Sequence, residues 1–438
     1  MDDLQKIVAL CKRRGFVFPS AEIYGGFSNT YDWGPLGVLL KNNVRDAWIR
    51  AHVQRRDDVD LLDAAIITSP SVWKASGHVD NFVDPLVECL GECRQRFRAD
   101  HLENLEKCPT CGGKLSEPRN FNGMFQTQVG PVEDAGSVAY LRPETAQGQF
   151  VNFLNVATSM RRKLPFGIAQ VGRSFRNEIT PGNFVFRTRE FEQMEIEFFV
   201  QPGTDDEWFE HWVDAREGWY LSLGLRTHNL RRFEVPDDER AFYSKRTIDL
   251  QYHFPFGKGW EELEGIANRT GYDLGQHEQA SGERLRLFDD ETKEHVLPYV
   301  VEPAAGLSRA ALVFMVDAYE EQLLDAAKKD VRTVLHLHPA LAPYKAAIFP
   351  LSKKPELLEV SRKIYADLRT EWMVVHDVAS GIGKAYRRQD EIGTPYCITV
   401  DFQTLEDQAV TVRDRDTMQQ VRMAIADLRS YFAGVLQF

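Results

Sequence analysis

Residues 170–200, QVGRSFRNEITPGNFVFRTREFEQMEIEFFV, constrain the fold of this chain most, because charged and apolar residues alternate on both sides of a turn signal. The turn signal is Pro181-Gly182-Asn183: proline presets φ, glycine accepts positive φ and asparagine bonds its own backbone. The segment therefore predicts two antiparallel strands joined by a turn.

Side chains alternate between the two faces of a strand, so each predicted strand presents four residues on one common surface. We expect these to be Gln170, Ser174, Arg176 and Glu178 on the first strand, and Arg187, Phe191, Gln193 and Glu195 on the second. Arginine suits phosphate oxygens, an aromatic face suits a purine, and a carboxylate suits an amine. Such a surface could hold ATP beside an amine, although on alternation alone a charged, solvated sheet face is the more common case.

Size and charge set further limits. With 438 residues and 43% hydrophobic content, the chain is long enough for two or three domains with cores of their own. Its net charge of −12 argues against non-specific binding of a polyanion, but local basic stretches such as residues 384–388, KAYRR, still allow a nucleic acid to dock. Residues 1–16 read as an amphipathic helix, and no apolar run approaches a membrane span, so we expect a cytoplasmic protein without a membrane partner.

Four of the six cysteines form two closely spaced pairs: Cys89, Cys93, Cys108 and Cys111. The second pair stands among Pro109 and the glycines 112–113, which let the backbone turn tightly around a metal. In a chain expected in the cytosol, four thiolates suit a structural zinc better than disulfides, with unligated thiols as the alternative. Cys11 and Cys397 lie in apolar surroundings and are expected to be core thiols.

The order of residues in the central stretch resembles a known family. FRNE at 175–178, then Arg187, then Phe191 and Glu195 at intervals of four, resembles motif 2 of the class II aminoacyl-tRNA synthetases. The fuller wording, FRNEITPGNFVFRTREFEQMEIEFF, is similar to the glycine-specific members of that family.

Three other segments carry the same likeness, in the family's order. Residues 34–68 resemble motif 1, the helix and strand of the dimer interface, and residues 300–309, VVEPAAGLSR, resemble motif 3. Residues 142–148, RPETAQG, match the segment whose glutamate holds the substrate ammonium group. The likeness covers almost the whole chain.

The resemblance implies an α/β protein in two parts. Residues 1–338 would form an α+β catalytic domain, an antiparallel sheet flanked by helices, with a zinc-type insertion at about 86–120 and a charged insertion at about 201–245. From 339 to 438, alternating strand and helix patterns predict α/β units, and the resemblance identifies them as the anticodon-binding domain of the glycine, histidine, proline and threonine enzymes.

Local patterns predict five further elements. They are helices over 143–163, 207–222 and 310–324, and strands near 64–68 and over 260–270.

The family's reaction has two steps. The carboxylate of glycine would attack the α-phosphate of ATP, with Mg²⁺ present, to give glycyl-adenylate and pyrophosphate, and the 3′ end of tRNA(Gly) would then accept the glycyl group. The partners implied are glycine, ATP, tRNA(Gly) and a second copy of the chain in a homodimer.

The resemblance also assigns residues. Arg176 and Arg309 would be catalytic, because in-line displacement at phosphorus depends on positioning and charge stabilisation. Glycine would be bound by Arg98, Glu144, Phe191, Gln193, Glu195 and Glu302. ATP would be bound by Arg176, Asn177, Glu178, Phe186, Arg187, Phe191, Glu262, Leu263, Arg269, Gly306 and Arg309.

Taken without the resemblance, several of these residues have plainer explanations. Glu144 could compensate a helix dipole, Glu262 and Arg269 could form a structural ion pair, and Arg98 could lie on a solvated face. The chain also departs from the family at Ala304, where a serine is usual, so one hydroxyl contact with the amino acid is missing. The rival functions are a binding protein that kept this fold without catalysis, and a class II synthetase for another amino acid.

Overall fold

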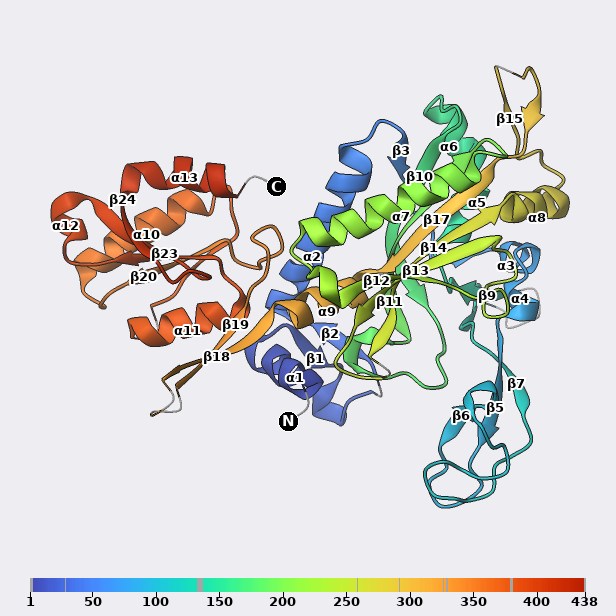
Figure 1. The fold of residues 1–438 in the computed structure, drawn as a ribbon, viewed down its shortest axis with the longest axis horizontal. Coiled ribbons are helices and arrows are strands. Elements are labelled where there is room, and N and C mark those ends of the chain that lie inside the picture. Colours follow the sequence, from blue (N-terminus) through green and yellow to red (C-terminus); the bar gives the residue numbers. More distant parts are fainter. Residues whose placement is uncertain are drawn as a thin grey trace.

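A seven-stranded sheet forms the centre of the larger lobe in the computed structural model of the protein (Figure 1). Its order is β12-β13-β14-β17-β11-β10-β3, and every neighbouring pair is antiparallel except β10 and β3. The strands are β3 (Val59–Leu61), β10 (Phe166–Phe175), β11 (Glu190–Val200), β12 (Leu230–Glu234), β13 (Arg246–His253), β14 (Trp260–Thr270) and β17 (Tyr299–Gly306). The structure describes residues 3–27, 29–131, 137–257, 259–290, 292–325, 327, 330–378 and 381–436.

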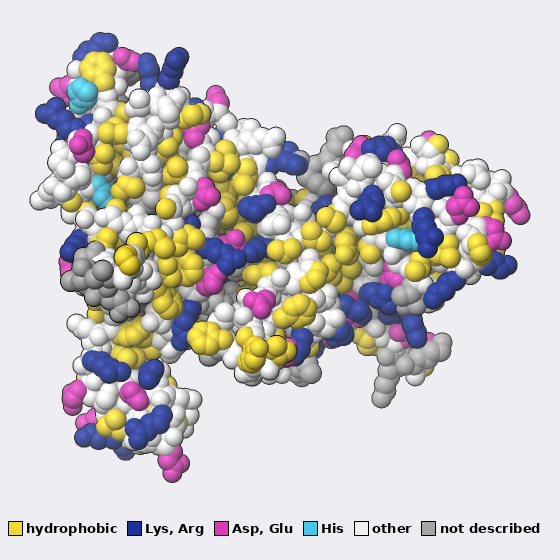
Figure 2. All heavy atoms as spheres, turned by 180° about the vertical axis from the view of Figure 1, so that it is seen from behind, with side chains coloured by type: hydrophobic (Ala, Val, Ile, Leu, Met, Phe, Trp, Pro, Cys, Tyr) yellow, Lys and Arg dark blue, Asp and Glu magenta, His cyan; other side chains and the backbone are white. Residues whose placement is uncertain are grey.

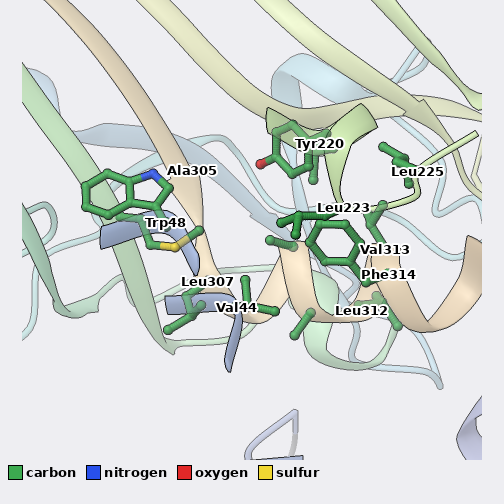
Figure 3. Packing of buried hydrophobic residues seen from close by; sticks show 14 of the residues in the cluster. Val44, Trp48, Tyr220, Leu223, Leu225, Ala305, Leu307, Leu312, Val313 and Phe314 are labelled. Carbon is green, nitrogen blue, oxygen red and sulfur yellow. The ribbon is translucent and has the colours of Figure 1, made fainter. Parts of the chain in front are cut away.

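One face of this sheet packs on three long helices, α2 (Pro35–Ile49), α7 (Asp205–Ser222) and α9 (Leu307–Ala318). Figure 3 shows Trp48, Tyr220 and Phe314 from these helices within one apolar layer. Even-numbered residues of β11, such as Met194 and Phe198, are fully buried in the same layer, because a strand sends alternate side chains to one face. Burial of this layer is the main source of stability in the lobe.

The other face of the sheet carries the odd-numbered residues of β11. At one end Phe199 packs with Phe150 of α5 (Ala146–Val151) and Phe153 of α6 (Phe153–Ser159). Toward the other end the same face presents Glu197, Glu195 and Gln193. Polar groups are thus placed beside a short apolar cluster, on a rigid strand.

The predicted pairing of residues 170–200 is confirmed, but both strands are shorter than expected. Gln170 lies opposite Glu195 and Ser174 opposite Phe191, so these side chains share a face. The strands stop at Phe175 and Glu190, and the loop between them contains a 3-10 helix, Phe184–Phe186. Asn183 and Phe184 both adopt positive φ within this loop, and Arg176, Glu178 and Arg187 lie on the loop instead of on the strands.

Three other elements differ from expectation. The helix expected over 143–163 is α5 and α6, separated at Asn152, whose side chain donates to the Gly148 carbonyl at 2.8 Å. The helix expected over 310–324 ends at Ala318, because the chain continues as β18 (Tyr319–Asp325), paired with β19 (Asp330–Leu335). The strand near 64–68 is only β4 (Ile67–Thr68), paired with β9 (Val138–Leu141). The strand over 260–270 is confirmed as β14.

Residues 201–245 do not form the solvated insertion that their charge suggested. The helix expected over 207–222 is confirmed as α7, but its aromatic side chains Phe209, Trp212 and Tyr220 are fully buried against the sheet. The segment also supplies β12, an edge strand of that sheet. This part of the chain therefore belongs to the core of the larger lobe.

The cysteine segment does form a separate projection, visible at the lower right of Figure 1. Its own sheet is β6-β5-β7, from β5 (Val83–Glu88), β6 (Arg96–Arg98) and β7 (Arg119–Asn122). Lysine and arginine side chains are prominent on its surface (Figure 2). The exposed ones are Arg94, Arg96, Lys107, Lys114 and Arg119.

The smaller, C-terminal lobe holds a mixed five-stranded sheet in the order β21-β20-β22-β23-β24. Its strands are β20 (Ala346–Pro350), β21 (Val374–His376), β22 (Tyr396–Val400), β23 (Ala409–Asp414) and β24 (Gln420–Ala424), and its longer helices are α10 (Pro355–Leu368), α11 (Ile382–Ile392) and α13 (Leu428–Val435). The expected architecture, an antiparallel sheet flanked by helices followed by a mixed α/β unit, is confirmed. Within the described ranges, no helix is both long and apolar enough to cross a membrane.

A buried ion pair joins the two lobes. Arg332 of β19 donates to Asp390 of α11 at 2.8 Å, and both side chains are about 1% exposed. Arg413 of β23 donates to the same carboxylate at 2.9 Å. The hairpin of β18 and β19 therefore packs on the C-terminal lobe although it directly follows α9.

Candidate active site

A cavity of about 390 Å³ opens above the middle of the large sheet, on the face that carries Gln193 and Glu195. Strands β11, β13, β14 and β17, the loop after β10 and the start of α9 all contribute to its walls. Most residues assigned from the sequence line it together: Glu144, Arg176, Glu178, Phe186, Arg187, Phe191, Gln193, Glu195, Glu262, Glu302, Gly306 and Arg309.

Glu144 lies at the buried end of the cavity, just before α5. Its carboxylate accepts from Gln147 Nε2 at 3.0 Å and lies 3.3 Å from His78 Nε2, and His78 Nδ1 is in turn 2.8 Å from Ser76 Oγ. Burial opposes ionisation of Glu144, but the His78 imidazole and the Arg269 guanidinium outweigh burial and hold its pKa below the ordinary value. Glu144 is therefore a buried negative charge.

Glu195 and Glu302 face Glu144 from neighbouring strands. Thr145 donates its hydroxyl to Glu195, and Arg269 donates to Glu302. Burial, followed by the charges of Glu302 and Glu144, raises the pKa of Glu195 to about 8. Burial also raises the pKa of Glu302 to about 7, although Arg269 opposes that shift. Three buried carboxyl groups at one end of the cavity form a site for an ammonium group.

Arg176 and Arg187 lie on the loop side of the cavity. Arg176 donates from Nε to the Pro143 carbonyl at 3.0 Å, and its guanidinium lies over the ring of Phe191 at 5.4 Å. Among the described residues, no carboxylate forms an ion pair with Arg176 or Arg187. Two cations without a carboxylate partner, beside a half-buried aromatic ring, suit the phosphates and base of a nucleotide.

Arg309 lies at the far end of the cavity. Its Nη1 donates to the carboxylate of Glu262 at 2.9 Å, and its guanidinium covers the ring of Phe186 at 4.4 Å. Asp249 of β13 also lines this end, where burial and the charge of Glu262 raise its pKa to about 7. Oxygen donors of this kind are those that Mg²⁺ prefers.

Four residues assigned from the sequence do not line the cavity. Arg98 pairs with Asp84 at 3.0 Å and Asp100 at 2.7 Å, within the projecting lobe. Asn177 lines a neighbouring hollow, and Leu263 is buried on the opposite face of β14 from Glu262. Arg269 lies beneath the cavity, where it bonds Asp273 at 2.8 and 2.9 Å.

Sequence reasoning missed several groups around the glutamates. Thr145, Gln147 and His78 hold Glu144 and Glu195, yet nothing in their spacing marks them as partners. Asp273 anchors both Gln147 and Arg269 from α8 (Tyr272–Ser281). Glu197 did have a signal, because it continues the alternation of Gln193 and Glu195 along β11.

The four cysteines of the projecting lobe come together. Their four Sγ atoms all lie within 4.8 Å of one another, and three of the Sγ–Sγ distances are 3.4 to 3.5 Å. Four thiolates around zinc, at bond lengths of about 2.3 Å, lie about 3.8 Å apart. The backbone N–H of Gly113 lowers the pKa of Cys111 to about 6, and a Cβ added at Gly113 would come within 3.3 Å of two of the sulfurs. The donor set fits a tetrahedral metal.

The chain matches two family descriptions. Residues 129–318 match the family described as "tRNA synthetase class II core domain (G, H, P, S and T)", and residues 345–434 match the one described as "Anticodon binding domain". The first match contains the cavity glutamates and both loop arginines, and the second spans the mixed sheet of the C-terminal lobe.

Similar proteins from three bacteria are each named glycine–tRNA ligase. The protein from Cutibacterium acnes is 56% identical over 99% of this chain and 96% of its own length. Those from Bifidobacterium longum and Thermobifida fusca are 56% and 54% identical over 98% of this chain and 92% and 97% of their lengths. The similarity therefore runs through the cavity, the cysteine lobe and the C-terminal lobe alike.

Proposed function

Because the chain belongs to the glycine–tRNA ligase family, we infer that it attaches glycine to tRNA in two steps. Glycine and ATP first form glycyl-adenylate and pyrophosphate, and the 3′ end of tRNA(Gly) then accepts the glycyl group. The observation that carries this assignment is one cavity in which Arg176, Arg187 and the ring of Phe191 stand beside three buried glutamates. No protein nucleophile is required by this chemistry.

The first step depends on charge and position. Arg176 bridges the glycine carboxylate and the α-phosphate, Phe191 stacks on the adenine ring, and Arg309 binds the γ-phosphate at the other end. Glu262 and Asp249 would hold Mg²⁺, which supplies neutralisation of phosphate charge when ATP is bound. Arg187 and Glu178 complete the nucleotide site, Arg187 at a phosphate and Glu178 at the adenine amine.

Selection of glycine follows from the crowded glutamates. Glu144, Glu195 and Glu302 bind the ammonium group and leave no space for a side chain on the α-carbon. Rejection by steric clash can exceed the roughly 1–3 kcal/mol that one methylene contributes through favourable contact. Ala304 offers no hydroxyl here, so the carboxyl groups orient the substrate, with Glu302 held in place by Arg269.

ATP–pyrophosphate exchange tests the assignment. The purified chain, with Mg²⁺ and without tRNA, is offered glycine, alanine, serine, threonine or proline in separate reactions. We expect exchange with glycine alone. Exchange with another amino acid would replace the pocket assignment, and no exchange with any of them would favour a binding protein without catalysis.

The active form is a homodimer of the α2 type. Ile23, Tyr24 and Phe27, which precede α2, are 89%, 86% and 67% exposed, and exposed apolar clusters of this kind mark contact surfaces. Sedimentation of the wild-type chain is expected to give a dimer, which Tyr24→Arg weakens. A wild-type monomer at micromolar concentration would contradict this proposal.

Two further assignments are proposals of the same kind. The four clustered cysteines bind a structural zinc, and Arg98 and Asn177 reach the substrates when these bind. We expect the protein in the cytoplasm, where its tRNA and ATP are found, and cell fractionation would test that location.

A further inference from the structure

Glu197 of β11 is a fully buried carboxyl group directly behind the glycine pocket. Neither of its oxygens has a hydrogen-bond partner among the described residues. An oxygen of Glu197, one of Glu195 and one of Glu302 all lie within 4.8 Å of one another. A buried, unpartnered acid normally costs stability, so its position beside two substrate-binding carboxyl groups calls for a function.

The charged groups facing Glu197 come from four elements. They are Glu195 on its own strand, Glu302 on β17, Arg269 on β14 and Asp273 on α8, with Glu144 beyond them. Arg269 is the only cation in this set, and Asp273 and Glu302 already occupy its donors. Glu144 has His78 as a further partner, but the other four buried carboxyl groups share one arginine and cannot all be ionised, so the empty pocket must retain protons.

The protons are not shared evenly. Burial, followed by the charge of Glu302, raises the pKa of Glu197 well above its ordinary value. Glu195 and Glu302 face the cavity, whereas Glu197 does not line it. An ammonium group in the cavity therefore neutralises Glu195 and Glu302 more directly than Glu197.

We propose that glycine binding releases a proton from Glu195 or Glu302 to solvent, while Glu197 keeps its proton and, as a neutral acid, donates a hydrogen bond to the neighbouring carboxylate. Glu197 is then a positioning residue, which holds the ionised carboxylate toward the ammonium group. This inference rests on the proposed glycine site. The charge among the glutamates balances, because one ammonium group enters as one proton leaves, and the carboxylate of glycine is balanced by Arg176.

The proposal fixes the direction of a pH effect. Below pH 7, Glu195 and Glu302 must lose a proton before they can bind the ammonium group, so glycine affinity is weaker. Affinity should rise with pH, by up to about tenfold per unit for one released proton, and level off above about pH 8.

Titration calorimetry of the full chain with glycine, in buffers of different ionisation heat, measures the released protons directly. We expect a net release near pH 7 and a clearly smaller one at about pH 8.5. Glycine binding without proton release near pH 7 would overturn this inference alone. A wild-type chain that neither binds glycine nor exchanges pyrophosphate would overturn the proposed function as well.

Variants of Glu197 test the hydrogen bond. Glu197→Ala should raise the KM for glycine about tenfold and leave the KM for ATP unchanged, because the ionised carboxylate loses its donor. Glu197→Gln keeps an N–H donor and should restore the KM for glycine to within about threefold of wild type. The matched control is Glu190→Gln, an exposed glutamate at the start of the same strand. Equal loss in the Gln and Ala variants, with folding intact by circular dichroism, would show that Glu197 acts as an anion and overturn the proposal.

Discussion

Arg216 of α7 donates both ends of its guanidinium to the carboxylate of Glu264 on β14, at 2.6 and 2.9 Å, and neither side chain reaches the surface. The ring of Trp219 lies 4.7 Å from the guanidinium, and His52, in the helical turn that follows α2, contacts it as well. This pair fixes α7 to the sheet that carries the active site.

Loss of the Glu264 carboxylate should therefore leave an uncompensated buried cation. We expect Glu264→Ala to lower the free energy of unfolding by about 3–5 kcal/mol. The control is Arg232→Ala on β12, which removes partly exposed ion pairs with Asp214 and Glu217 of the same helix and should cost no more than about 1 kcal/mol. Equilibrium denaturation with urea gives both values. Similar small losses of stability in the two variants would show that the buried charge of Arg216 does not need the Glu264 carboxylate.

Arg176→Ala should slow glycine-dependent ATP–pyrophosphate exchange by at least about 10²–10³, because it removes charge stabilisation at the reacting phosphate. The matched control is Arg173→Ala near the end of β10, three residues before Arg176, where the arginine is more than half exposed and pairs with Glu190. Wild-type exchange in the Arg176 variant would remove that residue from its assigned role.

Cys108→Ala should release the bound zinc and lower the thermal midpoint, since three thiolates and a methyl group cannot complete a tetrahedral site. Elemental analysis of protein purified without chelators should give about one zinc per chain for the wild type. Cys11→Ala, at a buried thiol outside the cluster, should keep its zinc. A wild-type chain free of zinc would disprove the assignment.

The raised pKa of Glu195 makes stability depend on pH in a definite direction. Its carboxyl group titrates near pH 8 in the folded chain and near its ordinary value, about 4.5, in the unfolded chain. The contribution of this group to stability is therefore fully present below pH 4.5 and is lost as pH rises through 8. Glu195→Gln mimics the protonated form at every pH. We expect the variant to gain stability relative to wild type between about pH 6 and about pH 8.5.

Thermal unfolding of both proteins at each pH measures this change, and the comparison cancels the titration of histidines common to both. Glu190→Gln, at the exposed end of the same strand, serves as the control. A constant difference between wild type and Glu195→Gln across that pH range would show that Glu195 is already ionised in the folded protein.

Which side chains of β11 share a face of the sheet could be predicted from the sequence, because alternate side chains of any strand point to the same face. This alternation placed Phe191, Gln193 and Glu195 on one face correctly. The same alternation would have indicated Glu197, but it does not say how deep a residue lies. Depth is decided by the helices that cover the strand.

Contacts between distant segments could not be predicted in the same way. The charges of residues 201–245 suggested solvent exposure, whereas the spacing of Phe209, Trp212 and Trp219 indicates a buried helix face once their positions are compared. The ion pairs of Arg98 with Asp84 and of Arg269 with Glu302 join different strands, and sequence order does not show which strands lie side by side.

The buried contact between Arg332 and Asp390 bears on how freely the C-terminal lobe could be exchanged between proteins. A chimera that joins another anticodon-binding lobe after residue 338 retains Arg332 on β19. Unless the incoming lobe supplies a carboxylate where Asp390 stands, that guanidinium is left buried without a counter-charge, and the chimera unfolds more readily than either parent. Compatibility at this one position therefore limits which lobes can be transplanted.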